Sequence, residues 1–166
     1  MARAQSPVPA GFHTVTPHLI LDDAAGAIEW YRKALGAEEV VPRAIGPDGK
    51  IMHAEIRIGN SIVMLNDAMG GGRSAKTVGG SPVGLWLYVE DCDPLYHRAV
   101  GAGAEVPPGP MGVLADQFWG DRSGTVVDPF GYTWTIATRK EDLTAEEITQ
   151  RLDAFLQQFA CQQAAV

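Results

Sequence analysis

The chain has 166 residues, of which 46% are hydrophobic and 20% charged, and its formal net charge is -7. This length and composition are typical of one globular domain, and they exclude a disordered chain or a chain made of membrane-spanning segments. The negative charge provides no basic surface for a phosphate backbone, so a nucleic acid is not an expected partner.

Residues 1–12 are expected to form a flexible arm. Arg3 is followed by two prolines instead of an apolar run, which argues against a secretory signal. The most apolar stretch, Val83–Val89, is too short to cross a bilayer, so no membrane association is expected. Cys92 and Cys161 show no paired spacing, so the reducing cytoplasm is the expected location.

Residues 13–67 are predicted to form a first βαβββ module. A strand begins near Thr16, and a helix follows that Asp22 or Asp23 caps and Gly36 ends. The apolar residues of this helix lie on one stripe, namely Ala27, Ile28, Tyr31, Ala34 and Leu35. The predicted strands after it are Glu38–Ile45, Ile51–Ile58 and Ser61–Asn66.

Residues 68–82 are rich in glycine and are expected to form a flexible linker. They lack the Gly-Lys-Ser/Thr ending of a phosphate-binding loop, which disfavours that alternative. Residues 83–139 are predicted to form a second module. In it Asp93 caps a helix with Pro94 at the first position, and the turn Asp128–Gly131 precedes a strand at Tyr132–Ala137.

The two modules repeat one another. Thr16-Pro-His-Leu-Ile-Leu-Asp-Asp corresponds to Gly84-Leu-Trp-Leu-Tyr-Val-Glu-Asp at an offset of 68 residues, and a Gly-Ala-Glu recurs at an offset of 67. Self-similarity over such a period is typical of a duplicated structural unit. Each unit is too small to bury its own apolar face, so we expect the two to share one core.

Residues 140–166 are predicted to form a C-terminal helix and tail. Thr144 and Glu147 have the spacing of a capping box. Apolar residues then recur at helical spacing, at Ile148, Leu152, Phe155, Leu156 and Phe159. This pattern favours a helix that packs on the domain over one that binds a partner.

Several motifs together resemble the PhnB-like branch of the glyoxalase/bleomycin-resistance (vicinal oxygen chelate) superfamily. They are Thr16-Pro-His-Leu, Glu29-Trp-Tyr-Arg-Lys-Ala-Leu-Gly-Ala, His53-Ala-Glu-Ile-Arg-Ile-Gly, Phe118-Trp-Gly-Asp-Arg and Asp128-Pro-Phe-Gly-Tyr-Thr-Trp. The resemblance covers the chain from about Thr14 to Arg139, and so nearly the whole domain 13–139. It implies an α+β fold in which two βαβββ modules curve mixed sheets around a cup, here followed by a C-terminal helix.

The resemblance also implies where a metal would be held. Members of this superfamily take one ligand from the first strand and one from the last strand of each module, which are here Thr16, Met64, Gly84 and Thr135. Glycine has no ligating side chain, methionine is soft and threonine is a poor neutral donor. We therefore expect no metal and no other cofactor. A divalent metal held by His18, His53 and Glu55 is the weaker alternative.

Strand alternation predicts which side chains line the cup. His53, Glu55 and Arg57 are expected to face it, because the alternate residues Ala54, Ile56 and Ile58 are apolar and suit the helix side. The predicted ligand-binding residues are Thr16, His18, Met64, Trp86, Tyr88, Trp119, Asp121 and Thr135. The plainer alternative makes His53 and Glu55 a solvated strand face, and Trp86 part of the core.

The favoured function is metal-independent binding of an aromatic or amphipathic small molecule, by a homodimer. An aromatic pocket with a few polar groups is sufficient for this activity. The alternative is a glyoxalase-like lyase, isomerase or epimerase. It would use His53 or His18 as general base, with Glu55 orienting the imidazole.

Overall fold

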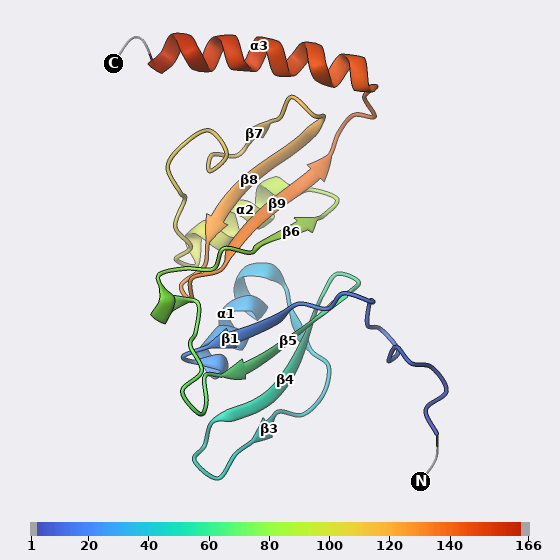
Figure 1. The fold of residues 1–166 in the computed structure, drawn as a ribbon, viewed down its shortest axis with the longest axis vertical. Coiled ribbons are helices and arrows are strands. Elements are labelled where there is room, and N and C mark those ends of the chain that lie inside the picture. The colour runs from blue at the N-terminus through green and yellow to red at the C-terminus, as the bar shows by residue number, and fades with distance from the viewer. Residues whose placement is uncertain (1–2, 164–166) are drawn as a thin grey trace.

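The computed structural model describes the backbone of residues 3–163 and the side chains of residues 3–157. It shows two mixed β-sheets, each backed by one α-helix, and a third α-helix at the C-terminal end (Figure 1). This confirms the expected α+β fold. Residues 3–12 contain no helix or strand, and all but the partly buried Phe12 are exposed, but their flexibility stays a prediction.

The first module contains one helix and five strands. In chain order they are β1 (His18–Leu21), α1 (Ala24–Leu35), β2 (Glu38–Glu39), β3 (Ala44–Ile45), β4 (Ile51–Ile58) and β5 (Ser61–Asp67). The sheet has the order β1-β5-β4-β2, and β3 also pairs with β4. β1 runs parallel to β5, whereas β4 and β5 form an antiparallel pair joined by a tight turn.

The second module repeats this topology. Its elements are β6 (Gly84–Tyr88), α2 (Cys92–Gly101), β7 (Ala115–Asp116), β8 (Asp121–Val127) and β9 (Thr133–Arg139). The sheet order β6-β9-β8-β7 matches that of module one, with the first and last strands again parallel. The edge strands β1 and β6 lie beside one another, and α1 contacts α2 (Figure 1). The repeat in the sequence therefore corresponds to a repeat in the structure.

The residues that cap α1 are those predicted from the sequence, whereas the residue that caps α2 is not. The Asp23 carboxylate accepts the N–H of Gly26 at 2.8 Å, and Gly36 ends α1 with a φ of 71°. The prediction that Asp93 caps α2 is wrong. Asp91 is the cap, because its extended backbone directs its carboxylate to the N–H of Asp93 at 3.2 Å. Pro94 is accordingly the third helical residue and not the first.

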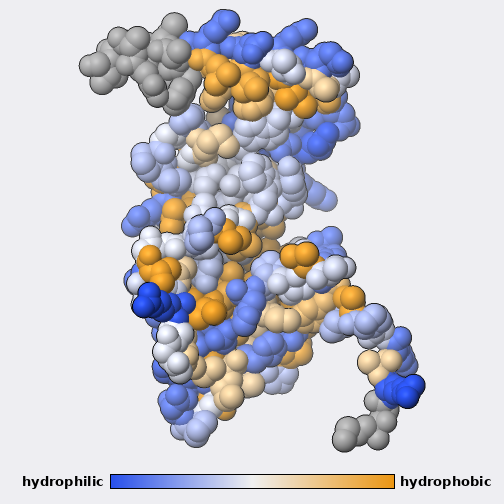
Figure 2. Space-filling model, in the orientation of Figure 1, coloured by the Kyte–Doolittle hydropathy of each residue, from blue (hydrophilic) through white to orange (hydrophobic). Residues whose placement is uncertain are grey.

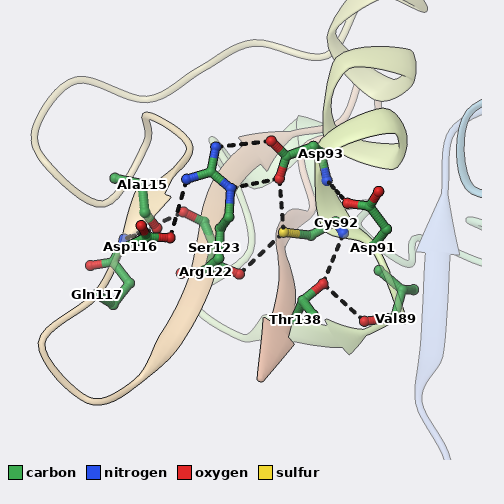
Figure 3. A network of polar contacts seen from close by, with 10 residues as sticks. All are labelled: Val89, Asp91, Cys92, Asp93, Ala115, Asp116, Gln117, Arg122, Ser123 and Thr138. Atoms are coloured by element: carbon green, nitrogen blue, oxygen red, sulfur yellow. Dashed lines mark hydrogen bonds and ion pairs between the residues drawn. The ribbon is translucent and has the colours of Figure 1, made fainter. Parts of the chain in front are cut away.

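Arg122 ties the beginning of α2 to the neighbouring strands (Figure 3). Its guanidinium donates to both carboxylate oxygens of Asp93, at 2.7 and 2.9 Å, and to Asp116 at 3.2 Å. The hydrogen bonds from Arg122 hold the pKa of Asp93 below its usual value. Cys92 is fully buried beside them, and its N–H donates to the Thr138 hydroxyl at 2.8 Å. Cys92 therefore has a packing role.

Two predicted strands differ from the observed ones. The single strand expected at Glu38–Ile45 is divided into β2 and β3, and the intervening residues include Pro42, which has no N–H for a ladder. The last strand begins at Thr133, one residue later than predicted, and extends to Arg139. β8 has no clear sequence pattern because it contains Gly124. A Cβ at Gly124 would lie only 2.5 Å from the Tyr96 ring.

The segment between the modules is partly buried. It contains a short 3₁₀ helix at Lys76–Val78, and Ser74 has no exposed surface. The N–H of Ser81 donates to the carbonyl of Gly131 at 3.0 Å, so the segment packs against the turn before β9. Whether it is flexible, as its composition suggests, stays a prediction.

α3 (Ala145–Gln163) crosses the far end of module two (Figure 1). The capping box is confirmed, since Thr144 N–H donates to Glu147 at 2.8 Å and Glu147 N–H donates to the Thr144 hydroxyl at 3.2 Å. Within the described residues α3 makes no extensive contact with another helix or strand, so the expected packing role is marginal. The side chains of Phe159 and Cys161 lie outside the described residues, and no described helix is long and apolar enough to cross a membrane.

A buried carboxylate lies in the core between the modules. Asp128 is 3% exposed, and its Oδ2 accepts the Tyr31 hydroxyl at 2.7 Å and Trp134 Nε1 at 2.9 Å. Its Oδ1 accepts the N–H groups of Phe130 and Tyr132, each at 2.9 Å. Burial raises the pKa of Asp128, although these four donors act in the opposite direction. Asp128 thus joins α1 to the turn and last strand of module two.

Further hydrogen-bonded contacts cross the same boundary, among them one from Arg98 Nε to the carbonyl of Ala34 at 2.9 Å. The Tyr132 hydroxyl donates to the carbonyl of Ile20 and accepts its N–H, both at 2.9 Å. Trp30 Nε1 donates to the carbonyl of Ala102 at 2.9 Å. The two sheets therefore form one body, with their helices on the same side (Figure 1).

We expect Asp128→Ala to lower the free energy of unfolding by about 3 kcal/mol or more, because each buried donor left without an acceptor costs about 1–3 kcal/mol. Urea denaturation would measure it. Asp142→Ala is the matched control: this carboxylate is 92% exposed and pairs only with Arg139 at the surface, so its loss should change stability by no more than about 0.5 kcal/mol. Equal effects of the two substitutions would contradict the role given to Asp128.

Candidate functional site

The face of each sheet opposite its helix is the candidate binding surface. In module one a row of paired residues crosses this face, from His18 through Met64 to Glu55. The equivalent row in module two runs from Trp86 through Thr135 to Thr125. The repeat therefore gives the two modules similar frames with different side chains: a histidine, a methionine and a carboxylate in module one, and a tryptophan and two threonines in module two.

Side-chain facing agrees with strand alternation in both sheets. Ala54, Ile56 and Ile58 are buried on the helix side of β4, which leaves His53 and Glu55 on the open face. In β6, Leu85 and Leu87 pack against the core. Trp86 is 48% exposed and Tyr88 57%, so both lie on the open side of the sheet. Trp86 is therefore not a core residue.

Three aromatic rings meet on the open face of module two, and we call Trp86, Tyr88 and Trp119 the aromatic triad. The ring centre of Trp86 lies 6.2 Å from that of Tyr88 and 6.3 Å from that of Trp119. The Tyr88 hydroxyl and Trp119 Nε1 both donate to Oδ2 of Asp121, at 2.8 and 3.0 Å. Asp121 is only 2% exposed. One buried carboxylate thus holds two rings, each of which contacts the third.

The turn between β7 and β8 places Trp119 there. Gln117 N–H donates to the carbonyl of Asp121 at 2.7 Å, and Gly120 N–H donates to the carbonyl of Gln117 at 3.0 Å. Gly120 has a φ of 96°, which favours glycine at this position. The sequence Phe-Trp-Gly-Asp therefore forms a tight hairpin tip with Trp119 near its end and Asp121 at the start of β8.

Module one presents a histidine and a carboxylate in contact. His53 Nε2 and Glu55 Oε1 lie 2.9 Å apart, with the two side chains 41% and 15% exposed. When Nε2 donates to Glu55, Nδ1 is left as a hydrogen-bond acceptor. His18 Nε2 forms a separate hydrogen bond with Asn66 Oδ1 at 2.5 Å. The imidazole of His53 is thus oriented by Glu55.

The structure does not gather all the predicted site residues. Thr16, expected in the first strand, precedes β1. Its hydroxyl donates to the carbonyl of His13. Thr135 is buried, and its hydroxyl bonds that of Thr125 at 2.9 Å. Met64 is half-buried between His18 and Glu55. Trp86, Tyr88, Trp119 and Asp121 are the predicted residues that form one cluster.

Thr125 was missed because β8 carries no clear strand pattern. Its pairing with Thr135 could have been found only by extending the internal repeat, in which Thr125 corresponds to Glu55.

The residues present do not fit the metal site that the resemblance implies. Within the described part of the chain no group of three or more His, Cys, Asp or Glu side chains could hold a metal ion. This includes the alternative set of His18, His53 and Glu55. The hydroxyl of Thr135 is already used by Thr125, and Gly84 has no side chain. That the protein binds no metal remains a prediction.

Two hollows lie along the boundary between the modules. One, of about 300 Å³, is lined by β1, β6 and the segment between the modules, and includes His18, Arg73 and Tyr132. The other, of about 510 Å³, is lined by the β4–β5 turn and by Trp86 and Tyr88 of β6. The second has the volume of a small-molecule site and adjoins the aromatic triad.

Comparison with known proteins agrees with this geometry. The model of the Glyoxalase/Bleomycin resistance protein/Dioxygenase superfamily matches residues 11–136. The uncharacterized protein Rv0887c of Mycobacterium tuberculosis is 45% identical over 139 residues, which are 81% of this chain and 79% of that protein.

Two solved structures are similar to this chain. The product of the Arabidopsis thaliana gene At5g48480 has a TM-score of 0.60 and 27% identity, over 76% of this chain and 98% of that one. A bleomycin-binding protein in complex with bleomycin has a TM-score of 0.53 and 17% identity, over 78% of this chain and 99% of that one. At that identity the second comparison concerns the fold alone.

The hydrogen bond to Asp121, and after it burial, raises the pKa of Tyr88 above its usual value. We expect Asp121→Asn to return it toward about 10, which phenolate absorbance during alkaline titration would show. Because the pKa of Tyr88 is higher in the folded than in the unfolded protein, its hydrogen bond stabilises the fold in full below a pH of about 10. This contribution to the free energy of unfolding is lost as the pH rises through the folded-state pKa. Trp119→Phe is the control, because it leaves the bond from Tyr88 to Asp121. An unchanged titration in Asp121→Asn would show that the bond is absent in solution.

Proposed function

Because the chain belongs to the glyoxalase/bleomycin resistance protein/dioxygenase superfamily, we propose that it binds an aromatic or amphipathic small molecule and needs no metal to do so. The observation that carries the proposal is the aromatic triad, two of whose rings are held by the buried carboxylate of Asp121. Superfamily membership confirms the resemblance in the sequence motifs.

The triad suits a flat apolar ligand for a physical reason. Large rings that a neighbouring hydrogen bond already holds lose little conformational freedom when a ligand stacks on them. Trp86 and Tyr88 keep about half of their surface exposed, so apolar area is available to a ligand. The net charge of -7 favours a ligand that carries positive charge over one that carries negative charge.

Binding through these rings requires no metal. The four positions where the superfamily would hold one contain no histidine or carboxylate, and no other suitable donor group is found among the described residues. Affinity would instead come from apolar contact and stacking on the rings of the triad, two of which Asp121 holds in place. This supports a binding protein over a metal-dependent lyase.

We further propose a cytoplasmic homodimer. On the face of the second sheet opposite its helix, Trp86 and Tyr88 are about half exposed in the single chain. Figure 2 shows hydrophobic side chains around the boundary between the modules and along α3. Apolar surface of this kind marks interaction sites, and a second copy facing the first would turn two open faces into closed cups.

The alternative function is a metal-independent lyase, isomerase or epimerase, and the contact between His53 and Glu55 favours it. Glu55 orients the imidazole, whose other nitrogen could remove a proton from a substrate. His53 belongs to the sheet of module one, however, and the aromatic triad to that of module two. Within one chain the base and the rings lie on separate sheets.

We expect Trp86→Ala to weaken ligand binding by about 1–3 kcal/mol through lost contact area. The probes are proflavine, a flat aromatic cation, and bleomycin, titrated while protein fluorescence is followed. Met52→Ala is the matched control, because Met52 is 52% exposed and lies on the helix side of β4. Equal affinities of Trp86→Ala and the unchanged protein for a probe that binds would remove the triad from the site. If neither probe binds the unchanged protein, the proposed ligand class is wrong.

His53 distinguishes the binder from the enzyme. For a binder we expect His53→Ala to reduce affinity by about 1 kcal/mol at most, the contribution of one hydrogen bond. For a catalyst that uses His53 as base, the same change would lower turnover by roughly 10²–10⁴. Mass spectrometry of each probe after incubation measures conversion, and Arg57→Ala on the same strand is the control. Conversion that disappears only in His53→Ala would establish the alternative.

A further inference from the structure

α3 lies beyond the part of the chain that the superfamily model matches, because the match ends at residue 136 and α3 begins at Ala145. One side of the helix carries Ile148, Leu152 and Phe155, which are partly buried, while Leu156 is 52% exposed. The attachment of α3 to the domain is therefore local, and it is concentrated around the hairpin tip that carries Trp119.

A row of ring contacts connects α3 to the aromatic triad. Phe155 of α3 lies 5.6 Å from Phe118, and Phe118 meets Trp119 edge to face at 4.8 Å. Trp119 in turn contacts Trp86 at 6.3 Å, and Trp86 contacts Tyr88 at 6.2 Å. Five rings thus form one continuous row from the C-terminal helix to the edge strand β6.

A second connection runs through the backbone. The carbonyl of Gly120 accepts the N–H groups of Lys140 and Glu141, each at 3.0 Å. A Cβ at Gly120 would lie 2.8 Å from the carbonyl oxygen of Glu141, so the two segments are closely packed. Arg151 of α3 forms an ion pair with Glu141. The residue after Trp119 is thereby tied to the segment that leads into α3.

From the side of the sheet, Trp119 is held by its hydrogen bond to Asp121 and by its ring contact with Trp86. β7 contains only two residues, and the oxygen of Asp121 that accepts this hydrogen bond also accepts the one from Tyr88. A side chain at the tip of so short a hairpin takes up a fixed position only if something packs behind it. Phe118 meets the Trp119 ring edge to face, and Phe155 of α3 packs on Phe118.

We propose that α3 is a positioning element of the ligand site, in which Phe155, acting through Phe118, holds Trp119 against Asp121 and Trp86. Phe118 and Phe155 are positioning residues and do not themselves contact the ligand. Because α3 and a ligand would both act on Trp119, docking of α3 and binding of ligand strengthen each other reciprocally. This consequence for affinity rests on the proposed function, whereas the positioning of Trp119 does not.

Fluorine NMR of the full chain labelled with 5-fluorotryptophan tests the positioning without a ligand. Four resonances are expected, for Trp30, Trp86, Trp119 and Trp134, each assigned by a Trp→Phe substitution. Phe155→Ala should shift and broaden the Trp119 resonance while those of Trp30 and Trp134 stay in place. Phe155→Leu should restore it in part, because leucine keeps the apolar contact with Phe118.

Leu156→Ala is the matched control, since it removes an apolar side chain of the same helix at a half-exposed position. Circular dichroism would verify that both alanine variants keep α3. An unchanged Trp119 resonance in Phe155→Ala, or an equal shift in Leu156→Ala, overturns the proposal.

Proflavine affinity measures the consequence for binding. Phe155→Ala should raise the dissociation constant about two- to tenfold, the range expected for loss of one aromatic pair, and Leu156→Ala should leave it unchanged. A shifted Trp119 resonance with unchanged affinity would overturn the coupling to the ligand. Failure of the unchanged protein to bind proflavine would count against the proposed ligand class, while the NMR result would still decide the role of α3.

Discussion

The buried carboxylate of Asp128 connects the two halves of this molecule. It accepts four hydrogen bonds, one of them from the hydroxyl of Tyr31 in the helix of the other module. A buried charge is tolerated only when donors surround it, so this group constrains the position of α1 relative to the last turn and strand of the chain. That constraint sets β1 beside β6 and leaves both open sheet faces on the same side.

A second buried carboxylate, Asp121, organises the open face in a similar way. It holds Tyr88 and Trp119 beside Trp86, so the aromatic surface has a defined shape before any ligand arrives. The duplicated frame gives module one a row with His18 and Glu55, and gives module two a row with Trp86 and two threonines. The same arrangement of strands thus presents polar groups on one sheet and rings on the other. A second copy of the chain would bring the two kinds of surface together.

Sequence reasoning succeeded where a short-range pattern determines structure. Strand alternation placed Trp86 on the open face, and the internal repeat predicted the paired topology. Patterns along the chain do not reveal a structure that depends on a residue far away in the sequence. β8 has no clear strand pattern because it contains Gly124, where the ring of Tyr96 leaves no room for a side chain. The part played by Asp128 depends on Tyr31, 97 residues away in the chain. The sequence does not determine whether His53 contacts Glu55, since residues two apart on a strand share a face but need not touch.

The central claim is that a superfamily frame built around a metal here binds a small molecule through aromatic side chains alone. Native mass spectrometry of the freshly purified full chain tests it most directly, because one spectrum reports bound metal, bound organic molecule and assembly state. The account predicts a dimer without a transition metal, carrying a non-covalent organic ligand that is lost on denaturation. Stoichiometric zinc, nickel or iron retained after gentle purification would contradict it.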